Sequence, residues 1–330
     1  MGIQVTDLHL LRDQLLVRRE KLEFALAKSQ TANLLQLLET VDQALERVEI
    51  GSYGICEKCN DTMGAQRLLT DPLARVCLDC LPPAEQRALE RDLELAARIQ
   101  IGLLPKQDLF AAGWKVAYHY QPAGLVSGDY CDLIAHGRYL YFMLGDVSGK
   151  GVAASMLMAN LHAMFRALIP TGLPLEQLVE RANRIFCEST LPTQYATLIC
   201  GRADEFGSVE ICNGGHVSPY HISSDRVRPL SSTTVPVGLF CDQQFSATRL
   251  TLAPGDSLVI YTDGVSEAED LEGRQYGDSS LATLLQQCFA RKSPELVSAC
   301  IEDLLAFRSG LTQIDDETLM VLQFSPGASA

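Results

Sequence analysis

The first part of the chain carries apolar side chains at helical spacing. Between Leu8 and Val48 they recur at every third or fourth position, which is the pattern of helices with one buried face. The polar stretch Ser29–Asn33 interrupts this pattern with residues that favour turns and helix N-caps over helix interiors. We therefore expect an antiparallel helical hairpin, a short coiled coil, over residues 1–50. A single continuous helix is the alternative.

A further apolar stripe lies just before the middle of the chain. Its members are Leu89, Leu93, Ala96, Ile99 and Leu103. Two prolines at 82 and 83 suit the start of a helix, and Pro105 ends it. We therefore predict a linker helix over residues 82–104. Because an apolar stripe needs a partner surface, this helix favours a homodimer, with packing on the rest of the chain as the alternative.

After Pro105 the pattern changes to the alternation that is typical of β-strands. The predicted strands are Trp114–Tyr120, Tyr139–Leu144, Tyr195–Cys200, Val209–Cys212, Ser257–Tyr261 and Thr318–Phe324. Two pairs of helices are predicted between them, at about 150–169 with 175–189 and at about 279–290 with 294–307. Strands with helices inserted in pairs favour an α+β fold, an α-β-β-α sandwich over residues 105–330, and argue against a parallel βαβ fold.

Composition narrows the class of protein. The chain has 330 residues, of which 47% are hydrophobic, and this is enough to bury a large core. No stretch approaches the ~20 consecutive apolar residues of a membrane span, and the N-terminus lacks the basic start of a secretory signal. The net charge of −14 argues against direct nucleic-acid binding, which needs clustered Lys and Arg. We therefore expect a cytoplasmic protein that has no membrane segment.

Eleven cysteines fall into two groups. Cys56, Cys59, Cys77 and Cys80 form two CxxC pairs seventeen residues apart, which is the spacing of a structural, four-coordinate Zn²⁺ site. Residues 51–81 are too few to form a hydrophobic core, so one Zn²⁺ should supply the missing stability. The remaining cysteines are predicted to be buried free thiols in a reducing compartment. They are Cys131, Cys187, Cys200, Cys212, Cys241, Cys288 and Cys300.

The two cysteine pairs belong to a longer sequence motif. Residues 41–80, with the motif GxYGxC and Arg67-Leu68 between the pairs, resemble the DksA/TraR-type zinc finger. Members of that family act on RNA polymerase through acidic residues at the tip of a helical hairpin. The corresponding tip here, Lys28–Asn33, contains no acidic residue. We therefore predict that the module dimerises the protein or docks a partner. A non-catalytic regulator that binds RNA polymerase is the alternative.

Acidic residues stand at the ends of the predicted strands. Asp146 and Asp263 each follow a strand, Asp315 precedes one, and Asp129 lies in the motif SGDY. Carboxylates that converge without basic partners repel each other, and a divalent cation removes this penalty. Hard oxygen ligands suit Mg²⁺ or Mn²⁺. Two such ions can share a water molecule, lower its pKa and align it with a phosphoryl group, so no nucleophilic side chain is needed.

The order of these motifs is characteristic. The chain contains RIQIGLLPK, YQPAGLVSGDYCD, GDVSGKGVAASMLMA, CNGGHVSPY, VPVGLF, LAPGDSLVIYTDGVSEA and DDETLMVL, in this order, between residues 98 and 322. Together they resemble the PPM-type metal-dependent serine/threonine phosphatases, closest to the SpoIIE-like branch of bacterial stress and sporulation signalling. The resemblance implies an α-β-β-α sandwich and a phosphoprotein substrate, with an anti-sigma-factor antagonist as the expected partner. Ser127 and Cys131 depart from the branch, which usually has Gly and an aromatic residue there.

The resemblance also implies roles for individual residues. Asp146 is expected to bridge both metals, with the Val147 carbonyl completing one of them. Asp263 and Asp315 are expected to bind the other metal. Asp129 resembles the acid that reaches a metal through water, and Asp316 is expected to substitute for or assist Asp315.

Two further residues are candidates for contact with the substrate. His216, in a tight glycine turn, could contact the phosphate or act as an acid, and a structural role is the alternative. Lys150 could approach the phosphate or face solvent at the start of a helix. The segment Gly145–Gly151 is one residue short of a P-loop and lacks its Ser/Thr, so an NTPase site is not expected.

Overall fold

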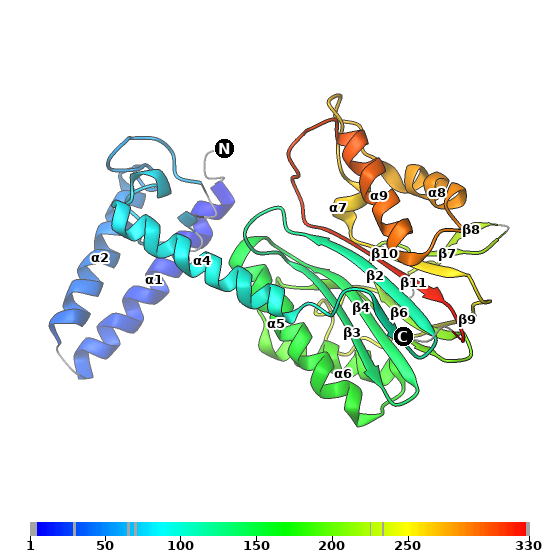
Figure 1. Cartoon of the computed structure of the whole chain (residues 1–330). Helices are drawn as coiled ribbons and strands as arrows, with labels where there is room; N and C mark the ends of the chain where they lie inside the picture. The colour runs from blue at the N-terminus through cyan, green and yellow to red at the C-terminus, as the bar shows by residue number, and fades with distance from the viewer. Residues whose placement is uncertain are drawn as a thin grey trace. The chain divides into compact units, whose positions relative to one another are not determined.

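The computed structural model describes residues 5–28, 31–64, 67–68, 71–224, 226–232 and 234–327 (Figure 1). It forms two compact units, Met1–Asp92 and Leu93–Ala330. The division between them falls inside helix α4 (Pro83–Leu103), the predicted linker helix. The finer division at residues 50, 81 and 104 stays a prediction.

The first unit begins with two helices, as predicted, and not with one continuous helix. Helices α1 (Val5–Lys28) and α2 (Ala32–Glu49) pack against each other, with the Arg19 Nε atom 2.8 Å from Asp42 Oδ1. Their shared core contains Leu11, Leu15, Val41 and Ala44. The side chain of Thr31 caps α2 by accepting a hydrogen bond from the Leu34 N–H. Two residues of the predicted tip, Ser29 and Gln30, lie outside the described residues.

The second unit contains two antiparallel sheets. The first has the strand order β1-β2-β11-β10-β7-β8 and the second the order β3-β4-β5-β6-β9. The first sheet consists of β1 (Leu109–Ala111), β2 (Trp114–Gln121), β7 (Tyr220–Ile222), β8 (Val227–Pro229), β10 (Ser257–Tyr261) and β11 (Glu317–Phe324). The second consists of β3 (Asp129–His136), β4 (Tyr139–Val147), β5 (Ala196–Asp204), β6 (Ser208–Gly214) and β9 (Thr248–Thr251).

Helices cover the outer face of each sheet (Figure 1). Helices α5 (Gly151–Leu168) and α6 (Leu175–Ser189) lie on the second sheet, and α8 (Gly277–Gln287) and α9 (Ser293–Arg308) lie on the first. The short helix α7 (Asp263–Ser266) follows β10 directly. Two 3₁₀ turns, η1 (Leu78–Cys80) and η2 (Ile169–Thr171), are also present.

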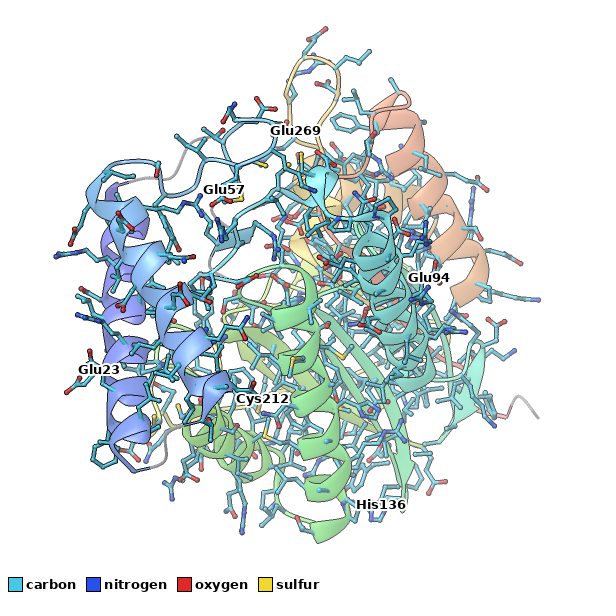
Figure 2. The ribbon with its side chains drawn as sticks, turned by 90° about the vertical axis from the view of Figure 1, so that its left-hand side faces the viewer. Glu23, Glu57, Glu94, His136, Cys212 and Glu269 are labelled. Atoms are coloured by element: carbon cyan, nitrogen blue, oxygen red, sulfur yellow. The ribbon has the colours of Figure 1, made fainter. Side chains whose placement is uncertain are left out.

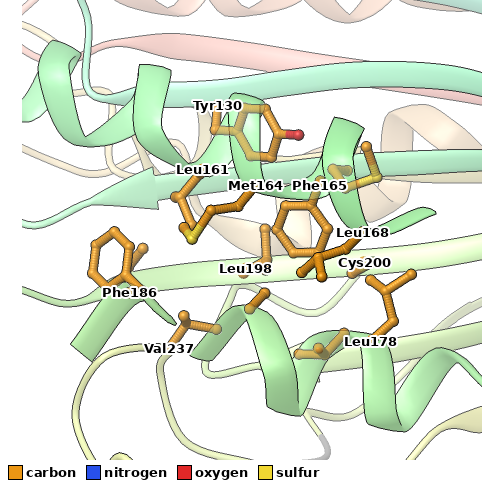
Figure 3. Packing of buried hydrophobic residues seen from close by; sticks show 14 of the residues in the cluster. Tyr130, Leu161, Met164, Phe165, Leu168, Leu178, Phe186, Leu198, Cys200 and Val237 are labelled. Atoms are coloured by element: carbon orange, nitrogen blue, oxygen red, sulfur yellow. The ribbon is translucent and has the colours of Figure 1, made fainter. Parts of the chain in front are cut away.

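Three buried apolar clusters separate these layers. The cluster between α5, α6 and the second sheet is shown in Figure 3. The cluster between the two sheets includes Trp114, Phe142 and Leu322, and that under α8 and α9 includes Val259 and Leu281. Four layers separated by three apolar interfaces make an α-β-β-α sandwich, which confirms the predicted fold class.

The alternation of side chains along the strands produces these layers. In β4, Tyr141 and Met143 face the helices, whereas Leu140, Phe142 and Leu144 face the other sheet. Because successive side chains of a strand point to opposite faces, a strand that is apolar throughout can fill two apolar layers. The near-continuous apolar composition of β4 therefore follows from burial on both faces.

One segment passes the length and composition test for a membrane span. This segment, Gly151–Thr171, consists of α5 and the turn after it. Leu161, Phe165 and Leu168 of this segment belong to the buried cluster under the helices (Figure 3). The buried face of this helix therefore packs against the second sheet, as a core helix of a sandwich does.

All six predicted strands are present, but β1, β3, β7, β8 and β9 were not predicted. The strand β3 is the instructive case, because it carries the buried Asp132. The guanidinium of Arg166 forms two hydrogen bonds with this carboxylate, at 2.7 and 3.0 Å. A buried carboxylate that is paired with an arginine can therefore occupy a strand position where the pattern of an isolated strand predicts an apolar residue.

Candidate active site

The predicted zinc ligands gather at one point. The sulfur atoms of Cys56, Cys59, Cys77 and Cys80 all lie within 4.8 Å of one another. The Cys77 N–H donates to Cys56 Sγ at 3.3 Å, and the backbone N–H of Cys59 lowers the pKa of the Cys56 thiol to about 6. Such a thiol readily becomes the thiolate that Zn²⁺ requires. The four-cysteine cluster is confirmed, and its soft, four-fold donor set fits one structural Zn²⁺.

Charged side chains brace the loop that holds this cluster. Glu57 lies in this loop (Figure 2), and its carboxylate accepts a hydrogen bond of 2.8 Å from Arg75. The Arg47 guanidinium at the end of α2 lies 3.4 Å from the same carboxylate. The Lys58 ammonium donates to the Cys80 carbonyl at 2.8 Å, which links the two CxxC pairs.

The acidic motifs of the second unit converge at one end of the sandwich. Asp146 lies near the end of β4, directly opposite Asp129 at the start of β3. Asp263 follows β10, and Asp315 and Asp316 precede β11, which pairs with β10. The strand ends therefore bring together acids that are far apart in the sequence. Their roles as metal ligands stay a prediction.

The electrostatics of this cluster favour a bound cation. Burial raises the pKa of Asp146 to about 7, and the charges of Asp263 and Asp315 add to the effect. Burial and Asp315 likewise raise the pKa of Asp263. The Lys150 ammonium partly offsets this repulsion, because it lies 2.9 Å from Asp315 Oδ2 and 3.2 Å from the Ile314 carbonyl. A divalent cation would relieve the remaining repulsion.

Two predicted ligand atoms face the same glycine. A methyl group placed on Gly128 would lie 3.2 Å from the Val147 carbonyl oxygen and 3.3 Å from Asp146 Oδ1. The carbonyl and the carboxylate therefore border the same small space. Hard oxygen atoms of this kind are the donors that Mg²⁺ and Mn²⁺ prefer.

Asp129 is buried and held by two threonines. Asp129 is only 1% exposed. Its Oδ2 atom accepts hydrogen bonds from Thr262 Oγ1, at 3.0 Å, and from Thr318 Oγ1. Burial is the main cause that raises the pKa of Asp129 well above its ordinary value. Sequence reasoning missed both threonines, although they belong to the motifs YTDG and DDET.

Asp316 fastens the loop before β3. Its two carboxylate oxygens accept hydrogen bonds of 2.8 Å from the backbone N–H groups of Ala123 and Gly128. These contacts favour a positioning role for Asp316, while Asp315 faces Lys150.

A second brace comes from helix α4. The amide of Gln100 donates to the Ser127 carbonyl at 2.7 Å and accepts from the Ser127 N–H at 2.9 Å. Gln100 is 5% exposed, whereas its apolar neighbour Ile99 is 60% exposed. The apolar stripe of the sequence therefore did not reveal the residue by which this helix holds the loop.

His216 connects two strands beside the cluster. Its Nδ1 atom lies 2.9 Å from Thr197 Oγ1, and its Nε2 atom lies 3.0 Å from the Tyr261 carbonyl oxygen. Because a carbonyl can only accept, Nε2 carries the proton and Nδ1 accepts from the threonine. Burial lowers the pKa of His216 to about 4. Both ring nitrogens are engaged within the protein, and this geometry favours a positioning role over contact with the substrate.

A hollow of about 390 Å³ borders the acidic cluster. Its walls include Lys150, Asp315 and Asp316 together with apolar residues from the loop before β3. Leu125, Val152 and Ile314 are more than 40% exposed here. The lining of the hollow therefore offers one cation, two carboxylates and an apolar rim to an incoming ligand.

Comparisons with known proteins agree with this architecture. Residues 136–325 match the family model described as Stage II sporulation protein E (SpoIIE), and residues 51–86 match the prokaryotic dksA/traR C4-type zinc finger. RNA polymerase-binding transcription factor DksA of Escherichia coli is 34% identical over 65 residues, which cover 20% of this chain and 43% of DksA.

The similarity to two relatives covers most of the chain. Protein IcfG of Synechocystis sp. is 26% identical over 261 residues, which cover 70% of this chain and 41% of IcfG. Phosphoserine phosphatase RsbU of Bacillus subtilis is 22% identical over 241 residues, which cover 72% of this chain and 71% of RsbU. The chain thus spans less than half the length of the first relative.

Solved structures show the same fold. The SiaA-PP2C domain of Pseudomonas aeruginosa has a TM-score of 0.65 at 19% identity and covers 73% of this chain and 98% of that domain. The RsbU and RsbW domains of a Mycobacterium tuberculosis protein give a TM-score of 0.59 at 28% identity, covering 66% of this chain and 62% of that one. Since the SpoIIE model spans 190 of the 330 residues, the chain belongs to the SpoIIE family of PP2C-like phosphatase domains, here joined to a dksA/traR-type zinc finger.

Proposed function

We propose that the protein is a metal-dependent phosphatase that hydrolyses phosphoserine or phosphothreonine in another protein. The single observation that carries this proposal is the convergence of Asp146, Asp263 and Asp315 at the strand ends. Besides burial, the charges of Asp263 and Asp315 raise the pKa of Asp146, and Asp315 also raises the pKa of Asp263. Relatives named phosphoserine phosphatase support the reaction class.

The donor set fits two divalent cations, Mn²⁺ or Mg²⁺. Asp146, Asp263 and Asp315 offer carboxylate oxygens, and Val147 offers a carbonyl oxygen on the same side as Asp146. Such cations, when bound, lower the pKa of a water molecule and neutralise charge on the phosphoryl group. A magnesium complex is known for RsbX, a structural neighbour with a TM-score of 0.53.

The chain's own residues position and charge the site. Thr262 and Thr318 hold Asp129, so that this carboxyl keeps its place opposite Asp146. Asp316 and Gln100 fix the loop that carries Gly128. Lys150, on the wall of the hollow, supplies positive charge to an incoming phosphate.

We infer the partners from the same resemblance. The substrate class is a small phosphorylated signalling protein such as an anti-sigma-factor antagonist, and the compartment is the cytoplasm. The zinc unit and the apolar stripe of α4 would serve dimerisation or regulation. The RsbU and RsbP names of two relatives support a role in signalling of this kind.

Hydrolysis assays test the proposal directly. An aryl phosphate and a phosphoserine peptide are incubated with the full-length protein and Mn²⁺, and the parent is compared with Asp146→Asn and Asp263→Asn. Both variants should lose most of the metal-dependent activity. Glu302→Gln, at an exposed position of α9, is the matched control and should keep it. Equal rates in the parent and both Asp variants would exclude the assigned centre.

A second candidate function rests on the zinc unit. The similarity to DksA and the α1–α2 hairpin favour a protein that binds RNA polymerase. Co-sedimentation of the full-length protein with core RNA polymerase tests this candidate. A complex that survives Asp146→Asn but is lost in a Cys56→Ser, Cys59→Ser variant would support it.

A further inference from the structure

Two of the seven cysteines outside the zinc finger are not buried. Cys187 in α6 is partly exposed, and Cys241, in the loop before β9, is exposed. The other five are buried, as predicted from the sequence, and they are Cys131, Cys200, Cys212, Cys288 and Cys300. The expectation that all seven are buried is therefore wrong for this pair.

Hydrogen bonds fix the loop of Cys241 on the helix of Cys187. The buried Asn183 amide donates to the carbonyl oxygens of Phe240, at 2.9 Å, and Cys241, at 3.2 Å. Its Oδ1 atom accepts from the Gly238 N–H at 2.8 Å. One side chain of α6 thus holds three backbone groups of the segment 238–241.

Cys187 lies on the same face of α6, one turn after Asn183. Its Sγ atom donates to the Gly238 carbonyl at 3.5 Å. Burial and the neighbouring Cys241 thiol raise the pKa of Cys187 to about 12. Cys187 therefore contacts the backbone of the same 238–241 segment that carries Cys241, and its raised pKa favours the protonated thiol.

The surrounding core keeps the two segments together. A methyl group on Gly238 would lie 2.7 Å from the ring of Phe186, so the loop approaches the helix as closely as a glycine allows. Val237 exchanges two backbone hydrogen bonds of 2.8 Å with Ala196. Phe186 and Val237 both belong to the buried cluster in Figure 3.

We propose that Cys187 and Cys241 are a peroxide-reactive thiol pair that forms a reversible disulfide between α6 and the 238–241 loop. The exposed Cys241, as its thiolate, attacks a peroxide oxygen, the O–O bond breaks, and a sulfenic acid and one water or alcohol result. The Cys187 thiol then attacks that sulfur, loses its proton, and the S–O bond breaks to release water. Overall two thiols lose two electrons and two protons to one peroxide.

This site is separate from the acidic cluster and does not depend on the proposed phosphatase activity. It still lies close to that cluster along the sheet, because Ala196 also pairs with Val147. A disulfide that fastens the 238–241 loop would therefore restrain the start of β5, which pairs with the predicted metal ligand Val147.

Peptide mapping tests the proposal. The zinc-loaded, full-length protein is treated with hydrogen peroxide at a dose that releases no zinc, alkylated with iodoacetamide and digested with trypsin without reduction. We expect peptides 185–202 and 227–249 to be joined, with a mass two hydrogen atoms below their sum, and to separate on addition of dithiothreitol. Fragmentation should assign the link to Cys187, because the other cysteine of the first peptide, Cys200, is buried.

Single variants provide the controls. Cys187→Ser and Cys241→Ser should each remove the linked peptide, and peroxide should then convert Cys241 of the first variant to sulfinic or sulfonic acid. Such overoxidation of Cys241 in the parent protein, with Cys187 recovered as the alkylated thiol, would overturn the proposal. A link from Cys241 to any other cysteine would also overturn it.

Discussion

The Nε2 atom of His216 lies 3.0 Å from the carbonyl oxygen of Tyr261. This contact joins the turn after β6 in one sheet to the end of β10 in the other, two residues before Asp263. The bond requires a proton on Nε2, and the hydroxyl of Thr197 occupies the other ring nitrogen. The neutral imidazole therefore helps to set where the strand that leads to Asp263 ends.

The first prediction concerns stability at low pH. The folded-state pKa of His216 is about 4, below the ordinary 6.5, so the unfolded chain binds a proton that the folded protein does not. Stability from this residue is complete above pH 6.5 and is lost as pH falls towards 4. Between pH 7 and pH 5 the loss should be about 2 kcal/mol in the free energy of unfolding. Urea unfolding of the parent and His216→Asn at both pH values measures it.

The comparison uses the change with pH and not the absolute stability, because His216→Asn also loses contacts. Other groups, including the zinc thiolates, titrate equally in both proteins and cancel. The parent should lose more stability between the two pH values than the variant. The same loss in both proteins would contradict a neutral, buried His216.

The second prediction concerns the threonines that hold Asp129. Thr318→Val keeps the shape of the side chain but leaves a buried carboxyl oxygen with one hydrogen-bond donor fewer. The cost should be about 1–3 kcal/mol in the free energy of unfolding, and Thr262→Val should behave similarly. Thr283→Val, on the exposed face of α8, is the control and should stay within roughly 0.5 kcal/mol of the parent. Equal stability of Thr318→Val and the control would show that Asp129 does not need this donor.

The third prediction concerns the pH dependence of metal binding. Since burial and neighbouring acids raise the pKa of Asp146 to about 7, this carboxyl must lose a proton before it can bind a cation at lower pH. The Mn²⁺ affinity should therefore rise about tenfold from pH 6 to pH 8 and level off above pH 7. Isothermal titration calorimetry in buffers of different ionisation enthalpy measures both the Mn²⁺ affinity and the number of protons released on binding.

Asp146→Asn cannot release that proton and should bind Mn²⁺ weakly at both pH values. The zinc site is kept loaded throughout so that its thiols do not take up manganese. An affinity of the parent that is the same at pH 6 and pH 8 would argue against Asp146 as a ligand.

Much of the fold follows from local patterns. The prediction of a strand at Ser257–Tyr261 is confirmed with the same ends, because four consecutive apolar residues follow Ser257 and turn-forming residues flank the segment. The strand β3 was not predicted, because Asp132 is buried through its pairing with Arg166 of α5, which is distant in the sequence. A local sequence pattern therefore predicts a buried strand only where the buried residues are themselves apolar.

The same contrast holds for the residues of the candidate site. The aspartates stand out because each follows or precedes an apolar strand, and the cysteines because of their spacing. The residues that hold them do not stand out: Thr318 resembles any β-branched strand residue, and Gln100 any polar residue of a helix. Their importance comes from partners 189 and 27 positions away, which no single-segment pattern contains.

The fourth prediction concerns Gln100 as a positioning residue. In the parent, the Gln100 amide donates to the Ser127 carbonyl at 2.7 Å. In Gln100→Glu a carboxylate oxygen takes the place of this donor, so two hydrogen-bond acceptors face each other. The loop that leads to Gly128 and Asp129 should then shift, and the Mn²⁺ affinity should fall about tenfold or more, as is usual when support of a metal site is lost. Gln100→Ala should show a smaller loss, because water can replace the amide.

Glu94→Gln is the matched control, because Glu94 is exposed on the same helix (Figure 2). Its metal affinity should equal that of the parent. The melting temperature separates a local effect from unfolding, since a positioning role predicts a metal affinity that falls more than the stability does. If Gln100→Glu binds Mn²⁺ as the parent does, the contact between α4 and Ser127 serves only to attach the helix.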